Sequence, residues 1–233
     1  MKALVLLDID GTILLTGGAG GRAMIRAGVH LHGAAFCWDG IDPAGALDPQ
    51  LYRDAVAASG LEYRESDHAR FRERYFEMLA IELDGARHRD EIVTMPGIRA
   101  LIEGLAARRD VELGILTGNY EPSARMKLAA AGIDAAHFAF TASGDHADSR
   151  AGLVRWALDR IAETRGAPLS PERVVVVGDT ARDVECALAN GCLAFAVATG
   201  STSVERLRDA GAHHVVEDLA DASPLHALLD AMH

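Results

Sequence analysis

The stretch Leu4-Val5-Leu6-Leu7-Asp8-Ile9-Asp10-Gly11-Thr12 decides the fold of this chain. Its four consecutive apolar residues predict a strand that is buried on both faces, as in a parallel sheet. Asp8 and Asp10 follow at once, and a buried carboxylate is costly unless a cation or hydrogen bonds compensate its charge. Gly11 allows the chain to turn sharply there. Taken alone, the motif is also compatible with an ordinary strand followed by an Asp-Gly turn.

The composition is that of a globular protein with an acidic surface. Of 233 residues, 49% are hydrophobic and 24% are charged, and the formal net charge is -11. This charge disfavours nucleic acids and anionic membranes as partners, and no apolar stretch is long enough to span a membrane. Cys37, Cys186 and Cys192 form no C-x-x-C pair, and the apolar run after Lys2 is too short for a signal peptide. We therefore expect a cytoplasmic protein with reduced thiols; the sequence leaves its oligomeric state open.

The pattern of the chain changes near residue 95. Residues 17–94 read as helical, and Asp48-Pro49 predicts a helix start with Asp48 as the N-cap. Beyond Pro96, helical segments alternate with strands expected at 111–116, 137–141, 173–177, 192–198 and 213–216. Such alternation is typical of a parallel sheet. We therefore predict an α/β fold, with a Rossmann-like parallel-sheet core formed by residues 1–16 and 95–233 and an inserted helical cap domain formed by residues 17–94.

Polar residues follow three of the expected strands. Asp8 and Asp10 follow the first strand, Thr117-Gly118-Asn119 follow the strand expected at 111–116, and Gly178-Asp179-Thr180-Ala181-Arg182-Asp183 follow the strand expected at 173–177. Ligands of open parallel sheets bind beyond these strand ends, and a hydroxyl beside the free amides of a helix start can hold phosphate. Four aspartates at one edge repel one another unless a cation lies among them, and hard oxygen ligands favour Mg²⁺. Their occurrence together argues against ordinary caps and turns.

These motifs resemble those of the haloacid dehalogenase-like hydrolase superfamily. Asp8-Ile9-Asp10-Gly11-Thr12 is similar to its first motif, Leu116-Thr117-Gly118-Asn119 to its second, and Gly178-Asp179-Thr180-Ala181-Arg182-Asp183 to its fourth. The resemblance covers the core on both sides of the insertion. The place of the insertion resembles that in phosphoglycolate phosphatase-like members, which carry a helical cap after the first strand.

The resemblance implies a role for each of these residues. Asp8 would be the nucleophile that forms an aspartyl-phosphate, and Asp10 the general acid and then the base. Thr117, Gly118 and Asn119 would hold the phosphoryl group. Mg²⁺ would bind the Asp8 side chain, the Asp10 carbonyl oxygen and the Asp179 side chain, with Asp183 beside them. The implied activity is Mg²⁺-dependent hydrolysis of a phosphate monoester, with a small phosphorylated metabolite as substrate.

The family's third motif, a lysine or arginine against the nucleophile and the phosphoryl group, has two candidates here. Arg150 stands at the usual place, ahead of the helix that precedes the fourth motif, and a guanidinium can grip phosphate in bidentate fashion. Lys127 lies in the helix after Thr117, on its small and apolar face. Because a buried lysine needs a partner, we favour Lys127 as the motif residue and keep Arg150 as the alternative.

Other activities of the superfamily remain alternatives. Asp10 argues against dehalogenation, because a halide leaving group needs no proton. A phosphosugar mutase uses the same residues, and a catalytically idle binding module would share the fold. Related caps often carry a Gly-Arg-Thr-Asp-like loop, whereas this chain has Gly45-Ala46-Leu47-Asp48, without the basic and hydroxyl groups. The sequence therefore does not name the substrate.

Overall fold

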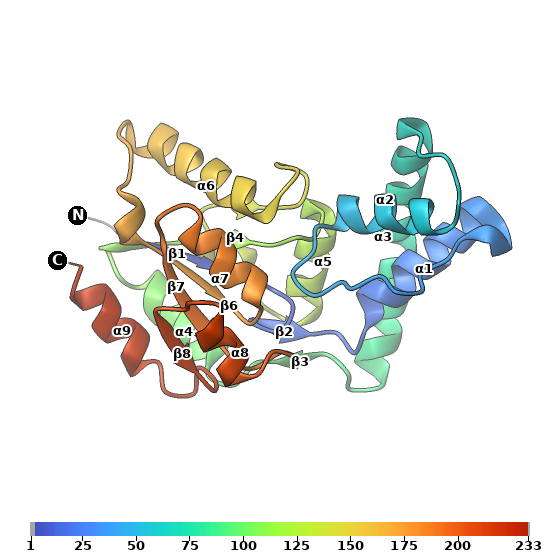
Figure 1. Cartoon of the computed structure of the whole chain (residues 1–233). Coiled ribbons are helices and arrows are strands. Elements are labelled where there is room, and N and C mark those ends of the chain that lie inside the picture. The colour runs from blue at the N-terminus through green and yellow to red at the C-terminus, as the bar shows by residue number, and fades with distance from the viewer. Residues whose placement is uncertain (1–2, 233) are drawn as a thin grey trace.

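A parallel sheet of six strands forms the centre of the protein (Figure 1). The computed structural model describes residues 3–232, and the strand order is β5-β4-β1-β6-β7-β8. Every neighbouring pair in this sheet is parallel. The strands are β1 (Ala3–Leu7), β4 (Val111–Leu116), β5 (Thr141–Ala142), β6 (Val174–Gly178), β7 (Leu193–Val197) and β8 (His214–Val216). This is the predicted α/β, Rossmann-like architecture.

Helices cover both faces of the sheet, which explains why β1 is apolar without alternation. All five residues of β1 are buried. Val5 and Leu7 belong to a hydrophobic cluster with α4 (Ile98–Ala106), α5 (Glu121–Ala130) and α9 (Ser223–Asp230). Leu4 and Leu6 belong to a second cluster on the other face, with α6 (Arg150–Arg165), α7 (Ala181–Leu188) and α8 (Val204–Asp209).

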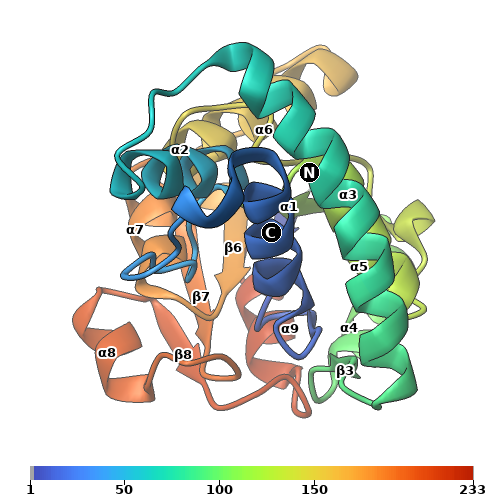
Figure 2. The same cartoon turned by 90° about the vertical axis from the view of Figure 1, so that its right-hand side faces the viewer.

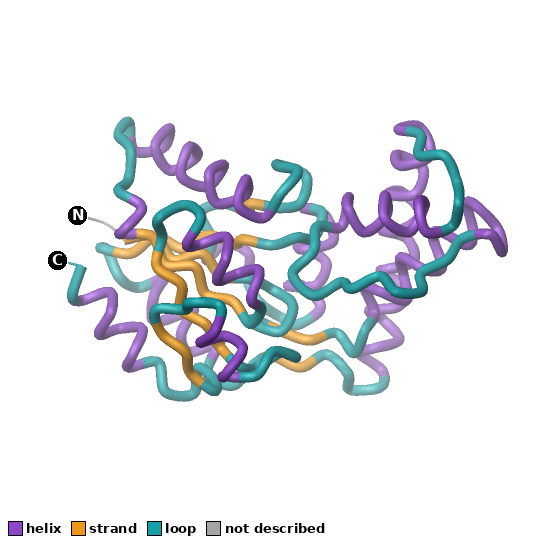
Figure 3. Tube along the Cα trace, viewed as in Figure 1, coloured by secondary structure: helices purple, strands orange, loops and turns teal. Residues whose placement is uncertain are grey.

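A helical segment lies beside the sheet rather than on its faces (Figures 1 and 2). It contains α1 (Ala19–His32), α2 (Asp48–Ala58) and α3 (Glu65–His88), and Figure 3 shows it as helix and loop. These helices share a third hydrophobic cluster, to which α5 contributes Ala130 and the preceding loop contributes Tyr120. We call this segment the cap; its limits at residues 17 and 94 as a separate domain stay a prediction.

A short antiparallel ribbon joins the two ends of the cap to the core. It consists of β2 (Leu14–Leu15) and β3 (Val93–Thr94). The sequence predicts no strand at the second of these positions, because two residues are too few to show a hydrophobic period. Within residues 3–232, no helix has both the length and the hydropathy of a membrane span.

Two local predictions were wrong. The strand expected at 137–141 is replaced by a short 3-10 helix at Ala135–His137, and β5 contains only two residues. Asp48 is the first residue of α2 rather than its N-cap; the N-cap is Leu47, and Pro49 lies in the first turn. The Asp48 side chain is therefore available for contacts outside its own helix.

Gly97 offers a direct test of the packing between α4 and the loop before α9. Its φ is 76°, and a Cβ atom there would overlap the backbone carbonyl of Leu219. We expect Gly97→Ala to lower the free energy of unfolding by roughly 3 kcal/mol or more, from backbone strain and overlap together. Gly166→Ala is the matched control, because its φ is 70° with no atom within 4 Å, and should cost roughly 1 kcal/mol. Equal losses in urea unfolding would contradict the packing argument.

Candidate active site

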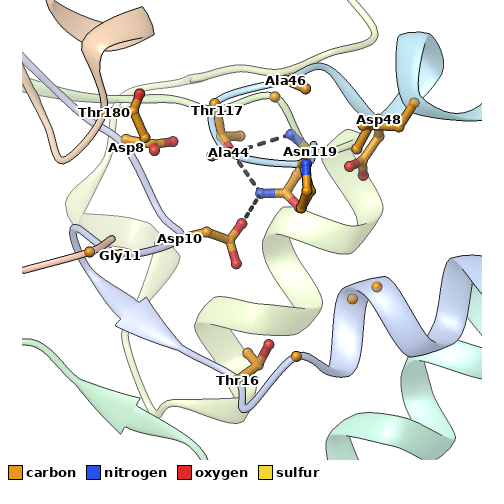
Figure 4. A pocket seen from close by; sticks show the side chains of 18 of the residues that line it. Asp8, Asp10, Gly11, Thr16, Ala44, Ala46, Asp48, Thr117, Asn119 and Thr180 are labelled. Atoms are coloured by element: carbon orange, nitrogen blue, oxygen red, sulfur yellow. Dashed lines mark hydrogen bonds between the residues drawn. The ribbon is translucent and has the colours of Figure 1, made fainter. Parts of the chain in front are cut away.

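The carboxyl ends of β1, β4 and β6 open into a pocket of about 600 Å³ between the sheet and the cap (Figure 4). All but one of the predicted site residues line this pocket; Asp183 lies outside the lining. Those that line it are Asp8, Asp10, Thr117, Gly118, Asn119, Lys127, Arg150 and Asp179. The topology therefore gathers three distant motifs at one place, as expected for the strand ends of a parallel sheet.

Arg150 is the cation that lies against Asp8. Ser149 caps α6 by accepting a hydrogen bond from the Gly152 amide, which places Arg150 in the first helical turn. Arg150 Nη2 lies 3.0 Å from Asp8 Oδ1, and Arg150 Nε donates to Asp183 Oδ1 at 2.8 Å. All three side chains are buried. In this geometry Asp8 contacts Arg150, whereas the favoured third-motif candidate, Lys127, contacts Asp10. Which of the two cations binds the phosphoryl group stays a prediction.

Lys127 instead holds Asp10. It lies on the buried face of α5, as its helical spacing predicts. Its Nζ donates to both oxygens of Asp10, at 2.8 and 2.7 Å, and to Asn119 Oδ1 at 2.7 Å. Asn119 Nδ2 in turn donates to Asp10 Oδ2 and to Thr117 Oγ1, both at 2.7 Å (Figure 4). The Asp10 side chain is 43% exposed and that of Lys127 only 6%, so a buried cation anchors a carboxylate that reaches the pocket.

Asp8, Asp179 and Asp183 form a buried carboxylate cluster. Each offers one oxygen atom within 4.8 Å of the others. Burial raises the pKa of Asp8 to about 7, although Arg150 opposes the shift, and burial and the charge of Asp8 raise the pKa of Asp179 to about 8. One guanidinium thus compensates the cluster incompletely, and the oxygen donors fit a hard divalent cation.

The three carboxylates of this cluster differ in whether their oxygen atoms already accept hydrogen bonds from the protein or could bind a metal ion. Asp183 Oδ1 accepts hydrogen bonds from Arg150, and Asp183 Oδ2 accepts from the backbone amide and hydroxyl of Thr180. Asp183 is thus fully engaged in positioning Arg150 and the start of α7. Asp8 and Asp179 line the pocket, and they are the two better placed to offer oxygen atoms to a metal ion.

The loop after β7 also contributes to the site, which the sequence analysis missed. Thr199 Oγ1 donates to the Gly11 carbonyl at 2.5 Å, and a Cβ atom on Gly11 or Gly200 would overlap the Asp179 carboxylate. Thr12 Oγ1 donates to Asp179 Oδ1 at 3.1 Å. Thr199 and Gly200 follow a strand of the sheet, so the rule that identified the other strand ends would have found them.

Asp48 ties the cap to the core on the other side of the pocket. Its carboxylate accepts hydrogen bonds from the Tyr120 amide at 3.0 Å and from Ser123 Oγ at 3.2 Å, at the start of α5. Its backbone amide donates to the Gly118 carbonyl at 2.7 Å, and a Cβ atom on Gly118 would overlap the carbonyl of Ala46. The Asp48 side chain, which belongs to the cap, therefore accepts a hydrogen bond at the N-terminus of a core helix, α5.

The Asp48 carboxyl predicts a pH-dependent term in stability. Burial raises its pKa from 3.8 to about 7, although Lys127 and the Tyr120 amide oppose the shift. The folded chain therefore keeps a proton that the unfolded chain loses, and this group lowers the stability as pH rises from about 4 to about 7. We expect the free energy of unfolding of Asp48→Asn to decline less steeply across that window, measured by urea unfolding at several pH values. Asp54→Asn, at an exposed position of the same helix, is the control, and a wild-type slope in Asp48→Asn would contradict the assignment.

Comparisons with known proteins agree with this architecture. A search of curated sequences found no match. Among solved structures, CbbY from Rhodobacter sphaeroides in complex with phosphate is similar at 21% identity and a TM-score of 0.74, covering 99% of this chain and 100% of that one. A predicted phosphoglycolate phosphatase from Haemophilus somnus is similar at 17% identity and a TM-score of 0.68, covering 97% and 98%.

A third solved structure represents the other activity considered above. The β-phosphoglucomutase from Clostridium difficile is similar at 15% identity and a TM-score of 0.72, covering 100% of this chain and 99% of that one. At such identities, these three likenesses establish the fold. The family model for haloacid dehalogenase-like hydrolases matches residues 5–188, which include all the motifs described above. The chain therefore belongs to the haloacid dehalogenase-like hydrolase family.

Proposed function

We propose that this hydrolase is a Mg²⁺-dependent phosphatase that cleaves a small phosphate monoester through an aspartyl-phosphate intermediate. The observation that carries the proposal is the pair of unlike aspartates at the end of β1. Asp8 lies buried against Arg150 and the other carboxylates of the cluster, whereas the Asp10 side chain is held by Lys127 and is partly exposed in the pocket. Two carboxyl groups in different environments suit a nucleophile and an acid–base group.

The first half of the reaction follows from these positions. An Asp8 oxygen forms a bond to phosphorus while the bond from phosphorus to the leaving oxygen breaks, and Asp10, which enters this step as the carboxylic acid, gives that oxygen its proton. In the described part of the chain, Thr117 Oγ1 only accepts hydrogen bonds, both from Asn119, so its own hydrogen is available for a phosphoryl oxygen. The Gly118 and Asn119 backbone before α5 lies at the same edge.

The second half returns the enzyme to its starting state. Asp10, now a carboxylate, takes a proton from the water molecule that attacks the aspartyl-phosphate, and inorganic phosphate and free Asp8 result. Lys127 and Asn119 keep the Asp10 carboxylate directed at the pocket during both proton transfers. Asp8, the Asp10 carbonyl oxygen and Asp179 would hold Mg²⁺, with Asp183 beside them. The bound ion would neutralise charge on the phosphoryl oxygens.

Phosphate release from p-nitrophenyl phosphate is the first test. We expect turnover with Mg²⁺, its loss in EDTA, and a loss of at least about a thousandfold in Asp8→Asn, because the nucleophile is gone. Asp10→Asn should lose about a hundredfold to ten-thousandfold, the usual range for an acid–base group. Unchanged circular dichroism is the folding control.

The same assay separates the alternatives. A folded wild-type protein that releases no phosphate from a broad panel of phosphorylated metabolites would contradict the phosphatase and support a binding module. Isomerisation of a sugar phosphate without release of phosphate would instead support a mutase. Normal turnover by Asp8→Asn would remove the nucleophile assignment alone.

A comparison of Arg150→Met with Lys127→Met should distinguish the roles of the two cations. Arg150 neutralises the buried carboxylates of Asp8 and Asp183. Its loss should therefore lower the free energy of unfolding by roughly 3–5 kcal/mol without Mg²⁺, and should abolish formation of the phosphoenzyme. Lys127 serves the partly exposed Asp10, so its loss should cost less stability and slow turnover while the phosphoenzyme still forms. Rapid-quench trapping of the phosphoenzyme and urea unfolding are the measurements, and the reverse pattern would exchange the two roles.

A further inference from the structure

The Tyr75 hydroxyl is a buried polar group of the cap beside the pocket, and it has no hydrogen-bond partner among the described residues. Tyr75 belongs to α3, has no exposed surface and lines the pocket. Within residues 3–232, its Oη makes no hydrogen bond. The nearby Ser123 hydroxyl has a single hydrogen, which it can donate to Asp48 or to the Tyr120 carbonyl, and its oxygen does not meet hydrogen-bond geometry with Tyr75 Oη. A buried hydroxyl without a partner costs free energy that a bound ligand can recover.

This hydroxyl lies close to the end of the pocket where the leaving alcohol would be protonated. A Cβ atom built on Gly20 of α1 would be 3.4 Å from Lys127 Nζ and 3.9 Å from Tyr75 Oη. Lys127 holds the Asp10 carboxylate, so Tyr75 and Asp10 flank the same region from cap and core. The absence of a side chain at Gly20 leaves room for a small group between them.

The charges of the residues that line the pocket limit the chemistry of the part of the substrate that could lie between Tyr75 and Asp10. The described lining residues from the cap include Asp42 and Asp48 but no lysine or arginine. Lys127 already donates to Asp10 and Asn119, and Arg150 already contacts Asp8 and Asp183. A second anionic group on the substrate would thus meet carboxylates and no available cation, which disfavours its binding.

We propose that Tyr75 is a specificity-determining residue that hydrogen-bonds the alcohol part of the substrate, and that the pocket selects phosphate monoesters of small, uncharged, hydroxylated alcohols. This inference rests on the proposed phosphatase function. A phenol can donate a hydrogen bond to a substrate hydroxyl and can accept one from it. By the same argument, esters whose alcohol part carries a carboxylate, such as 2-phosphoglycolate, are poorer substrates.

The test compares three phosphate esters of nearly equal size: 2-hydroxyethyl phosphate, ethyl phosphate and 2-phosphoglycolate. We expect the wild-type enzyme to have a kcat/KM at least about tenfold higher for 2-hydroxyethyl phosphate than for 2-phosphoglycolate. Tyr75→Phe should lower kcat/KM for 2-hydroxyethyl phosphate by about threefold to tenfold and leave that for ethyl phosphate within about twofold. Only a hydrogen bond to the substrate hydroxyl separates these two esters.

Tyr52→Phe is the matched control. Tyr52 belongs to the same hydrophobic cluster as Tyr75, its hydroxyl lies 3.0 Å from His32 Nε2, and it is not among the residues that line the pocket. It should leave the ratio of the two kcat/KM values unchanged. Equal losses on both esters in Tyr75→Phe, or a wild-type preference for 2-phosphoglycolate, would overturn the inference while the phosphatase function stands. A folded wild-type enzyme that hydrolyses p-nitrophenyl phosphate but none of the three would overturn this inference alone, and one that hydrolyses neither p-nitrophenyl phosphate nor any ester of the metabolite panel would overturn both.

Discussion

The compensation of buried negative charge at the end of β1 is the constraint on which this site depends. The sheet is covered on both faces, so its central strand delivers Asp8 into the interior. Arg150 neutralises part of that charge, and Asp183 and the start of α7 hold Arg150 in place. The remaining excess of carboxylates fits a divalent cation, which the proposed phosphatase would use to neutralise charge on a phosphoryl group.

Asp10 meets the same constraint in a different way. It stands two residues further along, where the chain leaves the sheet and the side chain can reach the pocket. Lys127 and Asn119 come from the loop and helix after β4, the strand next to β1, so the pairing of these strands brings cation and carboxylate together. Two aspartates separated by one residue in the sequence thus reach environments that differ in burial and in partner.

The cap completes the pocket. Its contact with the core is partly apolar, through the hydrophobic cluster that includes Tyr120 and Ala130, and partly polar, through the Asp48 carboxylate at the start of α5. Gly118 leaves space for the carbonyl of Ala46. Among the described lining residues, the cap contributes one phenol, Tyr75, beside glycines, apolar side chains and carboxylates. In the proposed function, the core residues carry out the phosphoryl chemistry and the cap residues contact the alcohol part of the substrate.

The sequence by itself determined the parallel sheet and the gathering of Asp8, Asp10, Thr117 and Asp179, because long apolar runs predict buried strands and their carboxyl ends meet at one edge. It did not determine the ribbon of β2 and β3 or the length of β5, since strands of two residues carry no pattern. Helical spacing placed Lys127 on a buried face, but only the tertiary structure decided that it pairs with Asp10 and that Arg150 pairs with Asp8. The contacts of Asp48 and the position of Tyr75 beside the pocket likewise depend on how the cap packs on the core. A local pattern specifies which face of a helix is buried, and the partner on that face comes from a distant part of the chain.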